Sequence, residues 1–265
     1  MGAGPAGAAA AMAARGQGLS VALIDKATFP RDKLCGGGLT GRAMAVMARV
    51  FGAGPDPERT LMTRHVRLVS GARLLGDFPD APVFGMVMRR EFDAGLKARA
   101  VAAGALDLTG RRVAALDPDA REVRLADGTA LAARVLIGAD GANSAVARAL
   151  FGRAFDPAAV AFALEAEAPA RPGTAIEIDL LAAHWGYGWV FPKQHSLTIG
   201  VGGTERRNPD LRRAMADYAA RHGAMGLRCK GAFIPSGEAR AGRGAVLLAG
   251  DAAGLCDPIT GEGLA

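Results

Sequence analysis

The stretch GAGPAG at residues 2–7 decides the fold of this chain. Residues 8–15 follow it as a run of strong helix formers, and an apolar run at residues 19–24 then predicts a strand. Asp25 stands at the end of that strand. The order is therefore glycine turn, helix, strand and acid, with the acid roughly twenty residues beyond the turn.

This order is that of a nucleotide-binding Rossmann unit. Glycine lets the chain turn tightly, lets backbone N–H groups approach a phosphate, and lets the helix pack closely on the strand. Asp25 is then placed to accept hydrogen bonds from ribose hydroxyls, and it would repel a 2′-phosphate. The expected nucleotide is therefore FAD or NAD. Its predicted phosphate cradle consists of Gly2, Gly4, Ala6 and Gly7.

Two further buried strands, at residues 134–137 and 245–249, lead into Gly-Asp turns at GADG (138–141) and GDAAG (250–254). Between them, apolar and polar residues alternate in a way that suits an antiparallel sheet interrupted by one helix. The expected elements are a strand at 83–88 with a helix at 89–103, strands at 160–167, 174–180, 185–191 and 197–201, and a helix at 209–222.

These elements predict an α/β protein with a Rossmann-type nucleotide-binding domain and an inserted antiparallel sheet for the substrate. The expected bounds are 1–153 and 241–265 for the nucleotide-binding domain and 154–240 for the sheet. A dinucleotide fold needs an apolar strand before its first glycine, where only Met1 stands here. We therefore expect that the first strand is missing and the return segment truncated, which leaves open a non-catalytic fragment that binds nothing.

Composition excludes several other classes of function. The net charge is +6, but Lys and Arg are scattered among Asp and Glu, so no nucleic-acid-binding stripe is predicted. Three cysteines without a CxxC spacing and four dispersed histidines predict neither disulfides nor a metal site, and favour a cytoplasmic protein. Because no apolar run reaches about 18 residues, we expect at most peripheral membrane contact.

The Gly-Asp turns carry a resemblance to a known group of flavoproteins. GDAAG at 250–254 resembles the flavin-side motif of the glutathione-reductase-like FAD oxidoreductases, and GADG at 138–141 looks like the companion motif of their hydroxylase-like branch. The resemblance implies FAD as the cofactor, with Asp140 and Asp251 near it and Asp251 accepting a hydrogen bond from the ribityl chain.

Three more motifs are similar to those of the geranylgeranyl reductase family within that branch. PRDKLCGG at 30–37 matches its PxxKxCGG pattern, RREFD at 89–93 its RxxFD helix start, and YGWVFPK at 187–193 its YxWxFPK segment. The resemblance spans essentially the whole chain. It implies an FAD-dependent reductase of isoprenoid C=C bonds that acts on a prenyl diphosphate, lipid or quinone and takes electrons from NAD(P)H or ferredoxin.

The resemblance also implies roles for single residues. It places Cys35, Gly36 and Gly38 close to the flavin, Arg89 on the polar chain of the cofactor and the backbone of Val113 at its adenine. Cys35 is the one catalytic candidate. From the residues alone, it is either a reactive thiol, for which Lys33 would supply part of an electropositive setting, or a buried structural thiol.

The substrate is expected along the YGWVFPK segment. Because Tyr187, Trp189 and Phe191 alternate, they share one face of a strand and form an aromatic wall, which suits a polyprenyl chain or simply fills a core. Pro192 and Lys193 complete this predicted substrate site.

PITGEGL at 258–264 would aim backbone N–H groups at the pyrimidine edge of the flavin from a helix start, through Gly261, Gly263 and Leu264. An FAD-dependent aromatic monooxygenase remains the alternative enzyme, because it shares the glycine turn and both Gly-Asp motifs.

Overall fold

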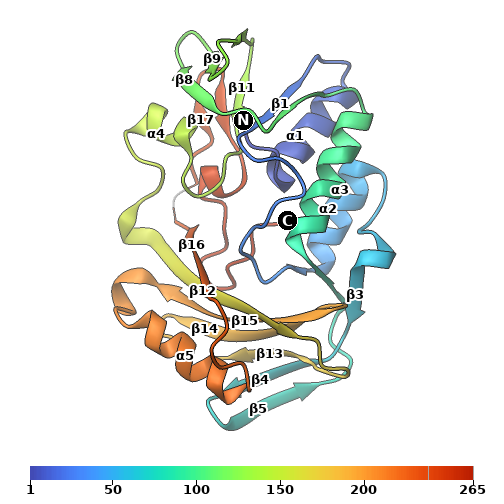
Figure 1. Ribbon diagram of the computed structural model, residues 1–265, viewed down its shortest axis with the longest axis vertical. Helices are drawn as coiled ribbons and strands as arrows, with labels where there is room; N and C mark the ends of the chain where they lie inside the picture. Colours follow the sequence, from blue (N-terminus) through green and yellow to red (C-terminus); the bar gives the residue numbers. More distant parts are fainter. Residues whose placement is uncertain (238, 265) are drawn as a thin grey trace.

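The computed structural model describes residues 1–237 and 239–264 as an upper part of helices and short sheets above a seven-stranded sheet (Figure 1). The chain begins in the upper part, and its C-terminal segment lies between the two parts (Figure 1). No helix within the described residues is long and apolar enough to span a membrane.

The predicted nucleotide-binding unit opens the upper part. Helix α1 (Pro5–Gly16) begins directly after the glycine turn, with proline in its first turn, where a missing N–H costs nothing. Strand β1 (Ala22–Asp25) pairs in parallel with β7 (Leu106–Thr109). Helix α3 (Arg89–Ala102) packs on α1 through small and apolar side chains such as Ala8. The predicted order of helix, strand and acid is therefore confirmed.

The two Gly-Asp turns lie at the same edge of a second parallel pair. Strand β11 (Leu136–Gly138) pairs with β18 (Val246–Leu248), and β18 also pairs with β17 (Gly242–Arg243). Because the first two strands are parallel, their C-terminal ends meet, and the turns that follow them lie side by side. Helix α4 (Ala145–Phe151) packs against this pair.

Met1 and Gly2 connect the two parallel pairs. The Gly2 amide donates to the carbonyl of Ile24 in β1 at 2.7 Å. The Met1 ammonium donates to the carbonyl of Ile137 in β11 at 2.6 Å, and the Met1 carbonyl accepts from Ala139 at 2.7 Å. The first residues of the chain thus hold β1 and β11 at a common edge.

The seven-stranded sheet differs in one respect from the antiparallel sheet expected over 154–240. Strands β4 (Val66–Ser70) and β5 (Arg73–Phe78) extend it at one edge, and β4 pairs in parallel with β13. The expectation missed these strands because their polar and apolar residues fit an exposed hairpin equally well. The order is β16 (Lys230–Pro235), β12 (Val160–Pro169), β15 (Ser196–Thr204), β14 (Gly186–Pro192), β13 (Ile176–Asp179), β4 and β5.

Helix α5 (Leu211–Arg221) covers the outer face of this sheet (Figure 1). Its buried side chains, Met215 and Tyr218 among them, pack on apolar residues of β12, β14 and β15, including Ile199. The alternate residues of those strands point away from α5, toward the upper part. We call that surface the inner face.

Short elements complete the upper part. The bounds are β2 (Gly38–Leu39), α2 (Gly41–Phe51), β3 (Thr60–Thr63), β6 (Phe84–Val87), β8 (Val113–Asp117), β9 (Glu122–Leu125) and β10 (Ala130–Ala132). Strand β6 pairs with both β2 and β3, and β9 with both β8 and β10. One-turn helices stand at Pro57–Arg59, Pro157–Ala159, Glu205–Arg207 and Gly250–Ala253.

The packing of α5 on the outer face gives a prediction for stability. Ile199 is 0% exposed, so Ile199→Ala leaves a cavity and lowers the free energy of unfolding by about 2–5 kcal/mol. Leu181→Ala, at a side chain that is 70% exposed, changes it by less than about 0.5 kcal/mol. Urea denaturation of the two variants checks this, and equal losses would contradict the packing.

Candidate functional site

Two positions of the glycine turn are packed too tightly to hold a side chain. Gly2 has φ +91°, and a Cβ there would lie 2.1 Å from the carbonyl oxygen of Ala139. A Cβ on Gly7 would lie 1.8 Å from the carbonyl oxygen of Gly2. The turn therefore needs glycine at both positions, as a backbone cradle for a diphosphate does.

A guanidinium lies beside the second glycine of this cradle. A Cβ on Gly4 would lie 3.2 Å from one terminal nitrogen of Arg31, and the other terminal nitrogen of Arg31 is buried without a hydrogen-bond partner among the described residues. A free N–H donor beside the N-terminus of α1 supplies donors of the kind that a phosphate requires. The residues of the turn thus fit a dinucleotide cofactor.

The GDAAG segment meets this cradle from the other side. Gly250 has φ +60°, and a Cβ there would lie 2.9 Å from the Cβ of Ala6. The amide of Ala249 donates to the carbonyl of Gly138 at 2.9 Å, which holds the two Gly-Asp segments together. Three motifs that are far apart in the sequence are therefore brought to one place.

The three predicted carboxylates have different partners. Asp25 accepts from the amides of Ala3 at 2.8 Å and Ala27 at 2.9 Å, so it braces the glycine turn and keeps lone pairs for a further donor. Asp140 accepts from the amide of Ala145 at 2.7 Å and from the Ser144 hydroxyl at 2.5 Å. Asp140 thus accepts hydrogen bonds from groups at the N-terminus of α4.

Asp251 is held by a thiol to which the sequence assigned no role. Cys256 is buried and donates to Asp251 Oδ1 at 3.2 Å. Burial, together with the Asp251 carboxylate, raises the pKa of Cys256, which keeps it a thiol. Lys33 Nζ lies 4.0 Å from the other oxygen of Asp251. The aspartate therefore stands between a thiol donor and an ammonium group.

Residues 33–38, which we call the cysteine loop, lie between the upper part and the inner face. The amide of Cys35 donates to Glu165 Oε1 at 2.8 Å, while the amide of Gly37 donates to Cys35 Sγ at 3.4 Å. A Cβ on Gly36 would lie 2.6 Å from the Phe191 ring. The loop is thus in direct contact with the aromatic residues, and Gly38 continues it into β2, paired with Met86.

On its other side, the cysteine loop faces a buried charge cluster. Arg89 donates to both oxygens of Asp93, at 2.6 and 3.0 Å, and Arg31 lies 3.1 Å from the same carboxylate. Burial lowers the pKa of Arg89, but the neighbouring Cys35 and Asp93 more than compensate, so the pKa is raised and Arg89 stays charged. The half-buried Cys35 therefore has a permanent cation beside it.

Tyr187, Trp189 and Phe191 share the inner face, as their alternation predicts. Their ring centroids follow one another at 5.8 and 6.2 Å. The Trp189 ring lies across β15, where a Cβ on Gly200 would be only 2.1 Å from it. Gly200 is directly opposite Trp189 in the register, so glycine at this position makes room for the indole.

Lys193 points back from the end of β14 toward the cysteine loop. It is 5% exposed, donates to the Thr198 hydroxyl and lies 3.8 Å from Glu167 Oε1. A Cβ on Gly37 would be 3.3 Å from its Nζ. Pro192, also buried, is paired with Leu197 at the same end of the sheet.

The C-terminal segment closes over the aromatic residues. The Tyr187 hydroxyl donates to the carbonyl of Thr260, and burial raises the pKa of Tyr187 to about 12. Thr40 donates to Glu262 at 2.6 Å, and Leu264 packs on a buried cluster around Leu39. Side-chain and backbone bonds of Asp257 hold 257–262 in a turn, and the helix start expected around Gly263 and Leu264 stays a prediction.

Two buried polar atoms on the inner face have no hydrogen-bond partner among the described residues: Oε2 of Glu165, which is 8% exposed, and Nε1 of Trp189, which is 6% exposed. Trp189 was predicted as a substrate-site residue, whereas Glu165 was missed. Burial raises the pKa of Glu165 to about 6. The signal that could have revealed Glu165 was the presence of two acids, Glu165 and Glu167, at alternate positions of the mainly apolar strand β12.

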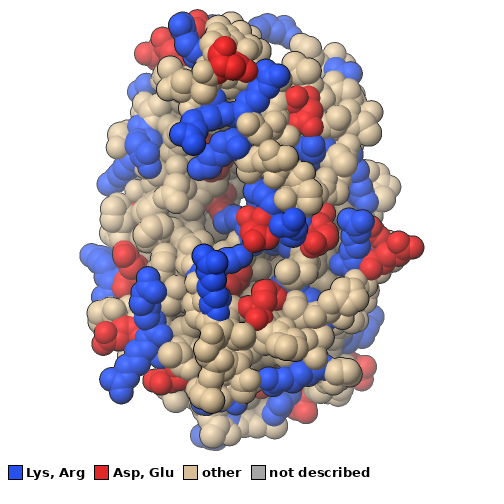
Figure 2. Space-filling view, viewed as in Figure 1, with Lys and Arg blue, Asp and Glu red and all other residues tan. Residues whose placement is uncertain are grey.

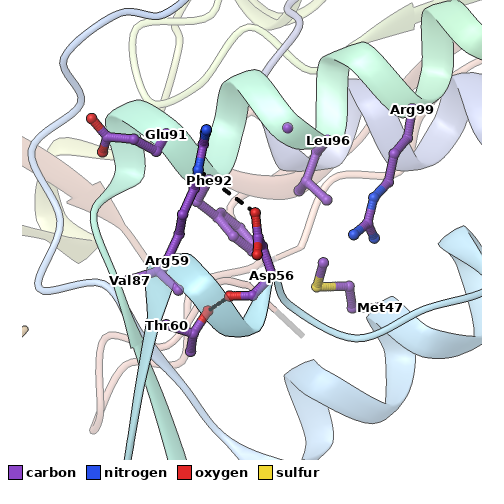
Figure 3. A pocket seen from close by; sticks show the side chains of 10 residues that line it. Met47, Asp56, Arg59, Thr60, Val87, Glu91, Phe92, Leu96 and Arg99 are labelled. Atoms are coloured by element: carbon purple, nitrogen blue, oxygen red, sulfur yellow. Dashed lines mark hydrogen bonds and ion pairs between the residues drawn. The ribbon is translucent and has the colours of Figure 1, made fainter. Parts of the chain in front are cut away.

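Figure 2 shows that the molecule is hollowed between its two parts, with Lys, Arg, Asp and Glu side chains at the border of the hollow. A separate cavity of about 140 Å³ lies behind α3 (Figure 3). Its described lining includes Asp56, which pairs with Arg59 at 3.6 Å, and none of the predicted site residues. Val113 opens β8 and packs against the upper core, apart from that cavity.

No sequence model of a protein family matches the chain. The chain is 35% identical over 294 residues to a menaquinone reductase of Mycobacterium tuberculosis, covering 100% of this chain and 72% of that relative. It is 32% identical over 286 residues to a geranylgeranyl diphosphate reductase of Rhodobacter capsulatus, covering 100% and 70%. A solved structure of a geranylgeranyl bacteriochlorophyll reductase-like protein from Thermoplasma acidophilum matches with a TM-score of 0.83 at 21% identity, covering 99% and 72%, which shows the same fold.

The contact between Gly200 and Trp189 gives a prediction for the inner face. Gly200→Ala displaces the indole, lowers the free energy of unfolding by about 1–3 kcal/mol and changes the near-UV circular dichroism. A Trp185→Phe background isolates the signal of Trp189, because the chain has two tryptophans. Gly54→Ala is the control, since its Cβ meets nothing within 4 Å. An unchanged spectrum for Gly200→Ala would show that the ring does not lie on β15.

Proposed function

Because this chain belongs to the geranylgeranyl reductase family of flavin-dependent oxidoreductases, we propose that it binds FAD and uses it to saturate C=C bonds of an isoprenoid chain. The observation that carries the proposal is the place of the cysteine loop. It contacts the cofactor cradle on one side, through Lys33 and Asp251, and the aromatic inner face on the other, through Gly36 and Phe191. A cofactor bound at the cradle and an apolar chain bound on the inner face would therefore both contact this loop and lie next to each other.

FAD would be held by residues of the upper part. The amides of the glycine turn and the free N–H of Arg31 would bind its pyrophosphate, Asp25 its ribose hydroxyls and Asp251 its ribityl chain. Bound FAD supplies hydride chemistry that amino-acid side chains lack. We keep the sequence-based roles of Arg89, at the polar chain of the cofactor, and Val113, at its adenine, as proposals.

The inner face would hold the substrate. Tyr187, Trp189 and Phe191 offer an apolar wall to a prenyl chain, and closing the C-terminal segment over them would exclude water. Lys193 would border the chain at the far end of β14. Pro192, which is paired with Leu197 of the outer face, would instead hold the end of that strand in place. We further propose that the substrate is a prenyl diphosphate, lipid or quinone, that NAD(P)H or ferredoxin supplies the electrons, and that the protein contacts membranes peripherally to reach a prenyl lipid.

We propose that the cofactor and the substrate bind to different parts of the chain. Residues 1–153 and 241–265 would carry the cofactor, and residues 154–240 the substrate, with the hairpin of β4 and β5 extending the substrate sheet. Asp140, which serves α4, would act by shaping the turn next to Gly2.

Anaerobic reaction of the dithionite-reduced holoprotein with geranylgeranyl diphosphate or menaquinone tests the proposed function. Mass spectrometry is expected to show a gain of two hydrogens for each saturated bond. The aromatic monooxygenase considered from the sequence would instead consume oxygen when NAD(P)H and an aromatic substrate are present. Oxygen consumption of that kind without any saturation would overturn the proposal.

A matched pair of glycine variants tests the cofactor cradle. Gly7→Ala forces the turn open, because its Cβ would lie 1.8 Å from the Gly2 oxygen, and is expected to weaken FAD binding at least about tenfold. Gly16→Ala, at the other end of α1, meets nothing within 4 Å and leaves binding unchanged. Flavin fluorescence titration measures both, and equal affinities would place the cofactor elsewhere.

A further inference from the structure

Glu165 lies in one cross-strand row with Gly200 and Trp189. The register pairs Glu165 with Gly200 and Gly200 with Trp189, so the three residues share the inner face. Since Gly200 has no side chain, no side chain of β15 stands between the carboxyl group and the indole. The buried, unpartnered Oε2 of Glu165 is therefore on the same surface as the aromatic wall.

Saturating a C=C bond requires a proton as well as a hydride. A pocket that excludes water cannot take this proton from bulk solvent at the moment of reaction, so a side chain must donate it. The donor has to have a pKa that is raised toward neutrality, be buried beside the apolar chain, and be connected to solvent so that it can be reloaded. One group on the inner face meets these three conditions.

Other acids near the site already have partners. The Tyr187 hydroxyl donates to the Thr260 carbonyl, and Cys256 donates to Asp251. Cys35 lies in the loop above the sheet, with its sulfur bonded to the Gly37 amide and next to Arg89 on the cofactor side. Glu165 alone among these groups combines a free oxygen with a place on the aromatic surface.

The surroundings of Glu165 favour its protonated form. Burial raises its pKa to about 6, against the opposing effects of the Cys35 amide and the Lys193 ammonium. The charged and titratable groups that face it are Lys193 at the end of β14, Glu167 on β12, Lys33 and Cys35 in the cysteine loop, and Lys230 on β16, which is paired with Asp32.

A chain of polar groups runs to solvent from Lys193, whose charge acts on Glu165. Lys193 Nζ donates to the Thr198 hydroxyl, which donates to Glu167 Oε1 at 2.5 Å. The Glu167 side chain is 39% exposed, and its second oxygen accepts from Ser196 at 2.7 Å. Glu167, Thr198 and Phe191 form the next row on the same face as Glu165, so the chain runs along the inner face to its rim.

We propose that Glu165 is the proton donor for isoprenoid saturation and that Glu167, Thr198 and Lys193 reload it from solvent. This rests on the proposed function. Glu165 would give its proton to one alkene carbon, where the π electron pair forms the new C–H bond, while bound reduced flavin would supply the hydride for the other carbon. The carboxyl O–H bond breaks and leaves a carboxylate, which then regains its proton along the polar chain. Trp189 Nε1–H stays free to donate to a polar atom of the substrate.

Single-turnover saturation by the dithionite-reduced holoprotein tests this role. Glu165→Gln is expected to slow saturation at least about 100-fold while the bound flavin content stays the same. The wild-type rate should fall as the pH rises through about 6, because the donor loses its proton, and the residual rate of Glu165→Gln should not follow that profile. Glu58→Gln is the matched control, since Glu58 is exposed on the one-turn helix Pro57–Arg59.

A second measurement needs neither substrate nor reduced flavin. The pKa of Glu165 is raised on folding from 4.5 to about 6, so the stability that its protonated form contributes is complete below pH 4.5 and is lost as the pH rises through about 6. The difference in melting temperature between Glu165→Gln and wild type should therefore shift in favour of the variant over this range. Glu58→Gln should show no such shift.

The outcomes separate the two proposals. If the wild type saturates an isoprenoid and Glu165→Gln does so at an equal rate with the same pH profile, the role of Glu165 is overturned and the proposed function stands. If the wild type binds flavin but saturates nothing, the proposed function falls, and the role of Glu165 falls with it. Glu167→Gln should slow later turnovers more than the first, and equal slowing of all turnovers would overturn the reloading path.

Discussion

The close contact between the backbone at Gly2 and that at Ala139 is the constraint on which the rest of the site depends. It leaves no room for a side chain on Gly2 and brings the glycine turn against the first Gly-Asp segment. The second segment joins through Gly250 and Ala6. Because backbone atoms make these contacts, they position amides rather than side chains, and amides in a fixed array are what a diphosphate binds. The cofactor cradle is thus a product of packing at distances that only small residues allow.

The cysteine loop connects the cofactor cradle to the inner face of the seven-stranded sheet. Its flanking residue Arg31 and the helix residue Arg89 share the buried carboxylate of Asp93, which fixes the loop against α3. A buried carboxylate between two guanidinium groups contributes more to positioning than the exposed pair of Asp32 with Lys230. The amide of Cys35 and the ring of Phe191 make the contacts on the other side. A structural change at the cradle would therefore displace residues of the inner face, because a few rigid contacts connect the two.

The two faces of the seven-stranded sheet have different roles, because alternate residues of each strand point to opposite faces. On the outer face, apolar residues of β12, β14 and β15 pack on α5 and hold the sheet together. On the inner face, the same strands present aromatic rings, glycines and two glutamates. The stability of the sheet thus depends mainly on the outer face. The inner face can therefore bury polar atoms, such as Glu165 Oε2, that have no hydrogen-bond partner among the described residues. Buried polar atoms without partners are costly, and they are tolerated where a ligand can satisfy them.

The sequence by itself determined the nucleotide-binding unit, most strands of the sheet and the shared face of Tyr187, Trp189 and Phe191, because glycine spacing and alternation are local properties of the chain. It could not show that β4 and β5 join that sheet, that Asp257 holds the C-terminal segment in a turn, or that Glu165 lies beneath Cys35. These features depend on contacts between residues far apart in the sequence. Only the tertiary structure decides them, since register and burial are set by packing partners that no local pattern names.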